Sequence, residues 1–181
     1  MQANTRKLTV YIAMSLDGFI AKPGDDLSFL ARVEKEGEDY GYSSFYERVD
    51  TVIMGRKTYD WVYSMTGEIP HPDKKLFVCT RQAEIQKEDT SYFSGDISSL
   101  VRELKKEAGK DIFCDGGAEI VQYLRKNQLI DEWIISVIPI FLGSGVRLFD
   151  AENKEEELEL LSATTFEKGL VQLHYRVNTE N

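Results

Sequence analysis

The sequence predicts an α/β domain whose central sheet is mostly parallel and has an antiparallel edge. Short apolar runs of strand length alternate with helical segments through most of the chain, as they do where crossover helices join parallel strands. Two strand-like runs, Leu158 to Phe166 and Leu170 to Val177, close the chain and predict an antiparallel hairpin. Ligands of such sheets bind beyond the carboxyl ends of the strands, so a functional site is expected there.

Five apolar runs predict the strands that precede this hairpin, because near-continuous apolar stretches are typical of strands buried on both faces. The runs are Leu8 to Met14, Thr51 to Met54, Lys75 to Thr80, Asp111 to Cys114 and Glu132 to Ile138. Apolar residues at helical spacing predict helices between them. These helices are Tyr42 to Val49, Thr58 to Tyr63, Leu100 to Ala108 and Ala118 to Lys126. The stretch from Leu27 to Gly37 fits no single pattern.

The length of the chain indicates its domain number, and its net charge indicates which partners are expected. The 181 residues fit a single domain that spans residues 1–181. The net charge of -9 repels the phosphate backbone of nucleic acids and anionic membrane surfaces, so neither is expected as a partner. An anionic ligand would need a local basic pocket. No apolar run reaches the length of about 18 residues that a membrane span needs.

The cysteines and histidines of the sequence bear on the cellular compartment of the protein and on whether it binds a metal ion. Cys79 and Cys114 lie inside apolar strand-like runs and are expected to be reduced and buried. The N-terminus lacks the features of a signal peptide, so a cytoplasmic location is expected. The chain has two histidines and no Cys/His cluster, so no metal site is predicted.

The segment VIMGRKTYD, from Val52 to Asp60, ends an apolar strand on a glycine, two cations and a hydroxyl. Gly55 permits a tight turn and the close approach of a ligand. Arg56, Lys57 and Thr58 then stand at the start of a helix, where free N–H groups and the helix dipole attract anions. This composition suits a phosphate group. Taken alone, the motif fits an ordinary solvated basic turn equally well.

Two further strand ends carry similar chemistry. Thr80 and Arg81 follow the strand LFVC, and Gly116 and Gly117 separate the strand DIFC from the next helix. A hydroxyl and a guanidinium suit a second phosphate, and paired glycines let a pyrophosphate approach a helix N-terminus. Each could instead be a surface arginine or a plain turn. Three such strand ends together predict a bound dinucleotide, although the GxGxxG fingerprint is absent.

These motifs resemble the dihydrofolate reductase superfamily. The segments VIMGRKTYD, LFVCTR and DGGAEIVQYLRKNQLIDEWIISVIPIFLGSGVRLF carry the resemblance, together with SLDGFIA from Ser15 to Ala21. They are most similar to the C-terminal reductase domain of the bifunctional riboflavin-biosynthesis deaminase-reductase. The similarity extends from about Leu8 to Val177. It implies a three-layer α/β/α domain that uses NADPH.

The resemblance also implies roles for residues at the phosphate groups of NADPH. Arg56 and Thr58 would face these phosphates, with Lys57 nearby. Thr80 and Arg81 would hold the adenosine 2'-phosphate that distinguishes NADPH from NADH.

Further roles concern the pyrophosphate and the nicotinamide. Gly116 and Gly117, with Ala118 and Glu119, would lie under the pyrophosphate. The Gly116–Gly117 peptide is expected to be cis, as it often is in this superfamily. Ala13 would lie beside the nicotinamide ring.

Hydride transfer to a C=N or C=O bond also requires a proton, which a residue or an oriented water must supply. Asp39 lies in the region that matches the substrate-binding acid of dihydrofolate reductases, although Tyr40 and Gly41 also fit that alignment. Asp17 follows the strand that would line the nicotinamide. Each aspartate has a structural alternative: Asp39 as a solvated acid near a helix start, and Asp17 as a turn residue.

The sequence differs from the riboflavin enzymes at a position that would contact the substrate. Phe19 stands where those enzymes usually have a lysine that aids the phosphorylated substrate, and an aromatic residue there could favour a flat, uncharged heterocycle. The MGRKT form is typical of dihydrofolate reductase instead. The expected function is NADPH-dependent reduction of a pyrimidine or pteridine heterocycle, most like 5-amino-6-(5-phosphoribosylamino)uracil reductase. Dihydrofolate reductase is the alternative within this class.

Two other classes stay open from the sequence. A catalytically inactive module that binds and senses NADPH would keep the basic strand ends without a catalytic acid. A purely structural protein would leave those strand ends unexplained. A homodimer is also expected, because the riboflavin branch commonly pairs through the sheet edge. Apolar residues that could form the interface, or could simply be core, are Ile134, Val137, Ile138, Ile140 and Phe141.

Overall fold

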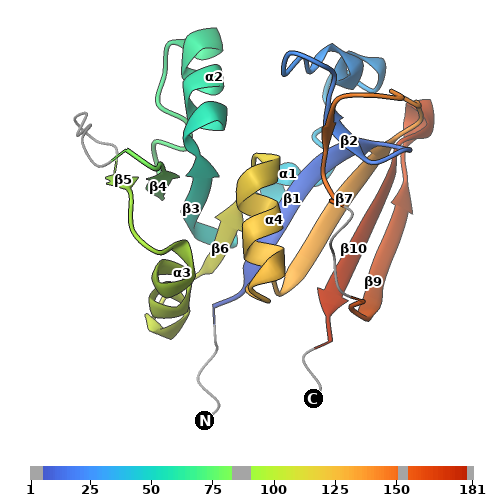
Figure 1. The fold of residues 1–181 in the computed structure, drawn as a ribbon. Helices are drawn as coiled ribbons and strands as arrows, with labels where there is room; N and C mark the ends of the chain where they lie inside the picture. Colours follow the sequence, from blue (N-terminus) through green and yellow to red (C-terminus); the bar gives the residue numbers. More distant parts are fainter. Residues whose placement is uncertain (1–5, 83–90, 151–154, 179–181) are drawn as a thin grey trace.

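The computed structural model describes residues 6–82, 91–150 and 155–178, and an eight-stranded sheet runs through them (Figure 1). Its strands lie in the order β5, β4, β3, β6, β1, β7, β10 and β9. The first six strands of this order, from β5 through β4, β3, β6 and β1 to β7, are parallel to one another. Strand β10 pairs antiparallel with both β7 and β9. The predicted mostly parallel sheet with an antiparallel C-terminal edge is confirmed. The strands are β1 (Leu8–Ser15), β3 (Val49–Gly55), β4 (Lys75–Cys79), β5 (Ser91–Phe93), β6 (Asp111–Cys114), β7 (Glu132–Ile138), β9 (Leu158–Thr165) and β10 (Val171–Val177).

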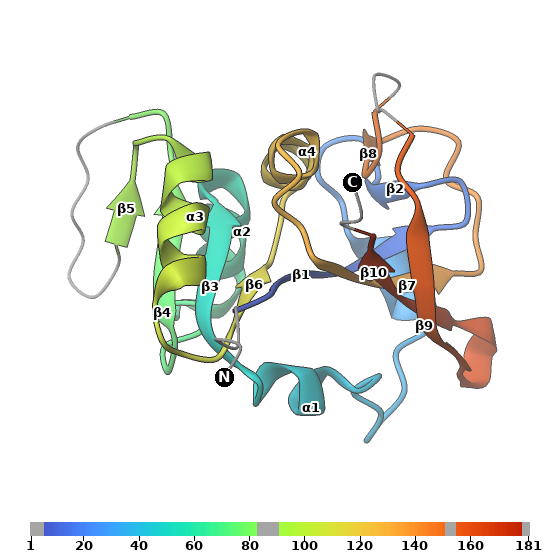
Figure 2. The ribbon, with the colours of Figure 1, turned by 90° about the horizontal axis from the view of Figure 1, so that it is seen from below.

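Helices lie against both faces of the sheet (Figure 2). Helices α3 (Ile97–Lys106) and α4 (Ala118–Lys126) cover one face, and α1 (Tyr42–Tyr46) lies on the other. Helix α2 (Arg56–Thr66) continues directly from the end of β3 (Figure 1). In the described part of the chain, no helix has both the length and the apolar character needed to cross a membrane. The remaining elements are β2 (Phe19–Ala21), which pairs with β8 (Val146–Arg147), and the 3-10 helices η1 (Ser28–Arg32) and η2 (Glu167–Gly169).

The core is divided by the sheet. Cys114 and Leu124 belong to the apolar cluster under α3 and α4, whereas Phe45 and Phe113 belong to the cluster under α1. Cys79 and Cys114 are buried free thiols, and burial raises the pKa of each to about 12. Both therefore act as small apolar core residues.

Helix boundaries differ from the sequence prediction at both ends of β3. The predicted helix from Tyr42 ends at Tyr46, and Val49 already begins the strand. Val49 is buried and lies opposite Asp111 of β6, so the sheet uses an apolar residue whose spacing also suited the helix. At the other end, α2 begins at Arg56 without an intervening loop.

Candidate cofactor and substrate site

Three neighbouring strands, β4, β3 and β6, bring the three predicted phosphate-binding segments to one edge of the sheet. The N–H of Gly55, at the end of β3, donates to the carbonyl oxygen of Gly116, with 2.7 Å between nitrogen and oxygen. Helix α2 begins at Arg56, directly after this contact, and α4 begins at Ala118. Segments that are distant in the sequence therefore form one surface.

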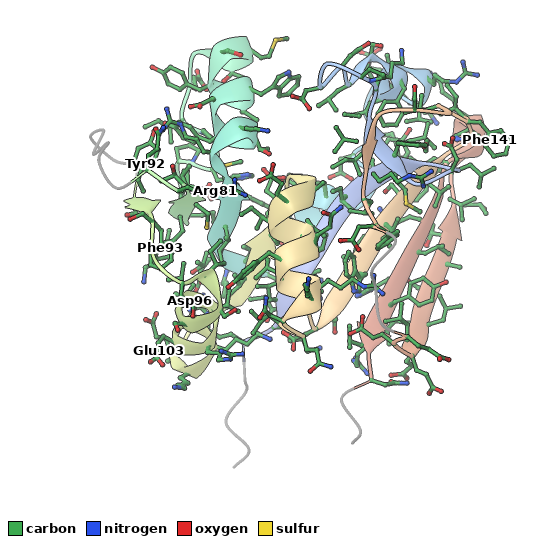
Figure 3. All side chains as sticks on the ribbon, viewed as in Figure 1. Arg81, Tyr92, Phe93, Asp96, Glu103 and Phe141 are labelled. Atoms are coloured by element: carbon green, nitrogen blue, oxygen red, sulfur yellow. The ribbon has the colours of Figure 1, made fainter. Side chains whose placement is uncertain are left out.

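Lys57, Arg81 and Glu119 form a charged cluster on this surface. The Glu119 carboxylate lies 3.6 Å from Nζ of Lys57 and 3.2 Å from Nη2 of Arg81. The Lys57 side chain is 86% exposed and that of Arg81 is 93% exposed, so both can turn from Glu119 to an incoming anion. Figure 3 shows Arg81 beside the start of α2, with Phe141 on the opposite side of the molecule.

Arg56 and Thr80 are oriented by neighbours of their own. Nε of Arg56 donates to Asp60 at 2.7 Å, and its guanidinium lies 5.5 Å from the centre of the Tyr92 ring. A guanidinium has five N–H donors, so most of those of Arg56 stay available for a ligand. The hydroxyl of Thr80 accepts the N–H of Gln82 at 3.1 Å.

The glycines between the strands and helices form a cradle that side chains would fill. A Cβ atom on Gly117 would lie 3.1 Å from the Thr58 hydroxyl, and one on Gly55 would lie 3.2 Å from Ile120. Gly116 has a φ of +93°, and the predicted cis Gly116–Gly117 peptide is confirmed. Among the described residues, no side chain caps the N-terminus of α2 or of α4. Uncapped N–H groups, a glycine cradle and nearby cations fit the pyrophosphate and phosphate groups of a dinucleotide.

A cavity of about 240 Å³ lies on the α1 side of the sheet. Its lining includes Tyr11, Ala13, Asp39, Tyr40, Ser136 and Ile138. The Tyr11 hydroxyl donates to the Tyr40 carbonyl oxygen at 2.9 Å and accepts from the Gln172 amide at 3.0 Å. These bonds hold Tyr11 and Tyr40 in place at the wall of the cavity.

Comparison with known proteins decides the family. A family model described as the RibD C-terminal domain matches residues 6–172. The chain belongs to this family. Its members are reductase domains of dihydrofolate-reductase-like fold, so the chain is a member of an oxidoreductase family.

Individual relatives resemble this RibD C-terminal domain along their whole length. The uncharacterized protein YwjB of Bacillus subtilis (strain 168) is 43% identical over 171 residues, which cover 94% of this chain and 97% of YwjB. A Shewanella sp. PV-4 structure, provisionally assigned to riboflavin biosynthesis, is 32% identical with a TM-score of 0.85, covering 95% and 99% of the two chains. Dihydrofolate reductase from Enterococcus faecalis, complexed with NADP(H) and RAB-propyl, shares the fold with a TM-score of 0.65 at 17% identity, and the match covers 95% of this chain and 96% of that one.

Asp39 lies at the rim of the cavity of this RibD C-terminal domain. Its two carboxylate oxygens accept the N–H groups of Gly41 and Ser43 at 2.9 and 3.0 Å, so it orders the start of α1. Bonding to Ser43 and Gly41 holds the pKa of Asp39 below its ordinary value. An ionised carboxylate at this place can accept a substrate N–H, but it has no proton to give.

Asp17 joins the end of β1 to the loop that follows β7. Its carboxylate accepts the Ser15 hydroxyl at 2.6 Å and the N–H groups of Leu142 and Gly143 at 3.0 and 2.7 Å. These bonds, with that of Ser15 the largest cause, lower the pKa of Asp17 to about 2. Its described contacts are therefore those of a loop-ordering residue.

The bonds of Asp17 are expected to survive acidification to pH 4 and to be lost as the pH falls toward 2. The folded-state pKa of about 2 is below the ordinary 3.8, so the carboxylate stabilises the loop at every pH above 3.8 and loses this effect at lower pH. Amide NMR shifts of Leu142 and Gly143 measure the titration. Asp17→Asn should displace both amide signals already at neutral pH, and a titration centred near 4 would contradict the assignment.

Phe19, considered from the sequence as a residue near the substrate, is buried. The residue is 4% exposed, and its ring lies under the Arg147 guanidinium, whose carbon is 4.6 Å from the ring centre. Phe19 lies in β2, opposite Arg147 of β8. The basic group outside this ring is supplied by Arg147, from a distant part of the chain.

Sequence reasoning missed His71 and Asp115. Nε2 of His71, in the loop after α2, lies 3.0 Å from Oδ2 of Asp115 at the end of β6. Asp115 immediately precedes Gly116 and lies within the motif CDGGAEI, which could have indicated it. His71 gave no signal, because it is 44 residues away in a loop without a recognisable pattern.

Proposed function

We propose that the protein is an NADPH-dependent reductase of a pyrimidine or pteridine heterocycle, most like 5-amino-6-(5-phosphoribosylamino)uracil reductase. The observation that carries the proposal is the convergence of two uncapped helix N-termini, two exposed cations and a glycine cradle beside a cavity. Membership of the RibD C-terminal family supports it. The NADP(H) bound by the structurally similar Enterococcus faecalis dihydrofolate reductase supports the choice of dinucleotide.

In this proposal the cofactor phosphates lie over the convergent strand ends. Gly55 and Gly117 leave room for the pyrophosphate, and the N–H groups at the starts of α2 and α4 donate to it. Arg81, next to Thr80, binds the 2'-phosphate. Arg56, Lys57 and Thr58 supply the remaining side-chain contacts to the phosphates. Gly116, Ala118 and Glu119 lie under the pyrophosphate and face it with backbone N–H groups.

The substrate lies in the cavity on the α1 side of the sheet. When bound, the nicotinamide would supply a hydride, and Ala13 is the β1 residue that leaves space for its ring. Asp39 accepts an N–H of the heterocycle, and Asp17 holds the loop after β7 in place. Close positioning of donor and acceptor is the main contribution of the protein to such a reaction.

The test of the proposal is NADPH oxidation by the purified protein, with dihydrofolate and the deaminated phosphoribosylaminouracil offered separately. Turnover of the aminouracil supports the leading assignment, and turnover of dihydrofolate supports the alternative enzyme. NADPH binding with no turnover of either acceptor would favour a sensing module. Absence of NADPH binding would overturn the proposal.

Arg81→Ala is expected to weaken NADPH binding about tenfold or more while changing NADH binding little. The guanidinium makes charge-assisted bonds to a phosphate that NADH lacks, and such bonds contribute about 1.5–3 kcal/mol. Cofactor fluorescence titrations measure both affinities. Lys106→Ala, an exposed cation on α3, serves as the matched control. An equal loss for NADPH and NADH would contradict the assignment of Arg81.

We also propose a homodimer that covers the β9 edge of the sheet. Strand β9 has mostly exposed residues, including Leu158 and Leu160 at 41% and 54%, and it is the last strand of the sheet. Of the residues expected at the interface, Ile134 and Ile138 are instead buried in the core, while Phe141 is exposed. Leu160→Lys is expected to shift a dimer to monomer in sedimentation. A wild-type protein that is monomeric at micromolar concentration would refute the dimer.

A further inference from the structure

Four side chains form a hydrogen-bonded chain from the surface to the cavity side of the sheet. Tyr46 of α1 donates its hydroxyl hydrogen to Asp73 at 2.7 Å. Nδ1 of His71 lies 3.2 Å from the same hydroxyl oxygen, and Nε2 lies 3.0 Å from Oδ2 of Asp115. The Asp73 side chain is 60% exposed, whereas that of His71 is 12% exposed. The chain therefore connects solvent to a largely enclosed imidazole.

The three contacts of this chain need three hydrogen atoms. Tyr46 supplies one, a neutral His71 supplies one, and the two carboxylates supply none. Bonding to Tyr46 holds the pKa of Asp73 below its ordinary value, so Asp73 stays ionised. Burial raises the pKa of Tyr46, so its hydroxyl keeps its hydrogen. The third contact has a hydrogen only where His71 and Asp115 share one more proton.

The imidazole of His71 lies among aromatic rings and beside the carboxylate of Asp115. The His71 ring packs against Phe113 and Tyr46, with ring centres 5.7 and 5.5 Å away. The Lys74 ammonium is 3.1 Å from Asp73 and so offsets the other carboxylate of the chain. The titratable groups around the pair are Tyr42 and Tyr46 from α1, Asp115 from the end of β6, and Asp73 and Lys74 from the loop of His71.

Strand register places Asp115 on the same face of the sheet as Tyr11, directly before the glycine cradle. Strands β1 and β6 are parallel, with Val10 opposite Cys114. Side chains alternate between faces, so the next residues, Tyr11 and Asp115, both face the α1 side. Tyr11 lines the cavity, and Asp115 is followed directly by Gly116 of the cradle.

We propose that His71 and Asp115 store one proton, which Asp115 delivers to the heteroatom of the substrate bond that is reduced. The inference rests on the proposed function, in which a reduced nicotinamide supplies the hydride to the carbon of a C=N or C=O bond. The heteroatom forms a new N–H or O–H bond as the Nε2–H bond of His71 breaks, with Asp115 passing the proton on. A solvent proton then restores the imidazolium. Asp115 is the catalytic residue, and His71 is its positioning residue.

Nitrogen-15 NMR of the cofactor-free protein tests the stored proton without any turnover. At pH 7 the wild-type His71 ring is expected to show two protonated nitrogens, and in Asp115→Asn it should show one. His174 is the matched comparison, because its Nε2 lies 2.9 Å from Glu132 on another part of the sheet and should not respond to Asp115→Asn. A His71 ring that is neutral in the wild type and unchanged in Asp115→Asn would overturn the proposal.

Turnover of the acceptor that the wild type reduces tests delivery of the proton. His71→Gln is expected to lower kcat about 10²-fold at pH 7 without changing the fluorescence-measured Kd of NADPH, since general acid catalysis contributes about 10²–10⁴-fold. His174→Gln should retain wild-type kcat. Equal activity of His71→Gln and His174→Gln would show that the pair has no role in catalysis.

The two experiments separate this inference from the proposed function. If the wild type binds NADPH but reduces neither dihydrofolate nor the aminouracil, the proposed substrates are wrong. The NMR result then still decides whether His71 and Asp115 hold the proton.

Discussion

Gly145→Ala is expected to destabilise the protein by about 4 kcal/mol, because the added methyl group has no space and the backbone is strained for any L-residue. A Cβ atom at Gly145 would lie 2.0 Å from the carbonyl oxygen of Ala21, and its φ is +138°. Ala21 pairs with Val146 in the small β2–β8 sheet. The substitution would therefore push β2 and β8 apart.

Urea unfolding of Gly145→Ala measures this loss of stability. Gly143→Ala is the matched control from the same loop. Its φ of +74° strains the backbone, while among the described residues, apart from its two chain neighbours, no atom lies within 4 Å of the added Cβ. The control is expected to lose only about 1 kcal/mol. If both variants lose the same free energy of unfolding, the contact with Ala21 is not the cause of the destabilisation by Gly145→Ala.

Arg6→Ala is expected to lower the free energy of unfolding by about 3 kcal/mol, because the guanidinium is buried and fully used. Arg6 is 4% exposed. It forms an ion pair with Asp50, donates to the Thr51 hydroxyl at 2.7 Å and to the Lys110 carbonyl oxygen at 2.6 Å. Its loss removes one donor from each of these acceptors, although Asp50 still accepts the Thr51 hydroxyl and the Lys110 N–H.

Thermal and urea unfolding measure the effect of Arg6→Ala. Lys106→Ala again provides a control, since this exposed cation pairs only with the exposed Glu103 among the described residues, and such pairs contribute about 0–1 kcal/mol. The loss of unfolding free energy in Arg6→Lys should lie between those of Arg6→Ala and Lys106→Ala, because lysine keeps the charge but not the planar fork of donors. A loss from Arg6→Ala no larger than that of Lys106→Ala would contradict the expected role.

Local sequence patterns were sufficient for most of the elements. Apolar runs identified the parallel strands β1, β3, β4, β6 and β7 but not the short β5, and two strand-like runs at the end predicted the hairpin of β9 and β10. The pattern was ambiguous at Val49, which suits both a helix face and a buried strand. The pairing of Val49 with Asp111 resolves it in favour of the strand, and this pairing is a long-range contact.

Some residues of the candidate site could also be predicted from local sequence patterns, and others could not. Glycine, cation and hydroxyl at strand ends are local features, so Gly55, Lys57 and Arg81 could be proposed from residue types alone. The partners of Asp17 could not be, because the N–H groups of Leu142 and Gly143 come from the loop after β7. The same holds for the Arg147 group that covers Phe19.

The α/β class, the mostly parallel sheet and the candidate phosphate-binding strand ends could be predicted from the sequence, because these depend on short-range periodicity and residue type. Long-range contacts were needed to show which acids accept backbone N–H groups and which acid has a histidine beside it. The order and register of the strands set those contacts. They bring His71 to Asp115 across 44 residues of sequence, where no local pattern could indicate it.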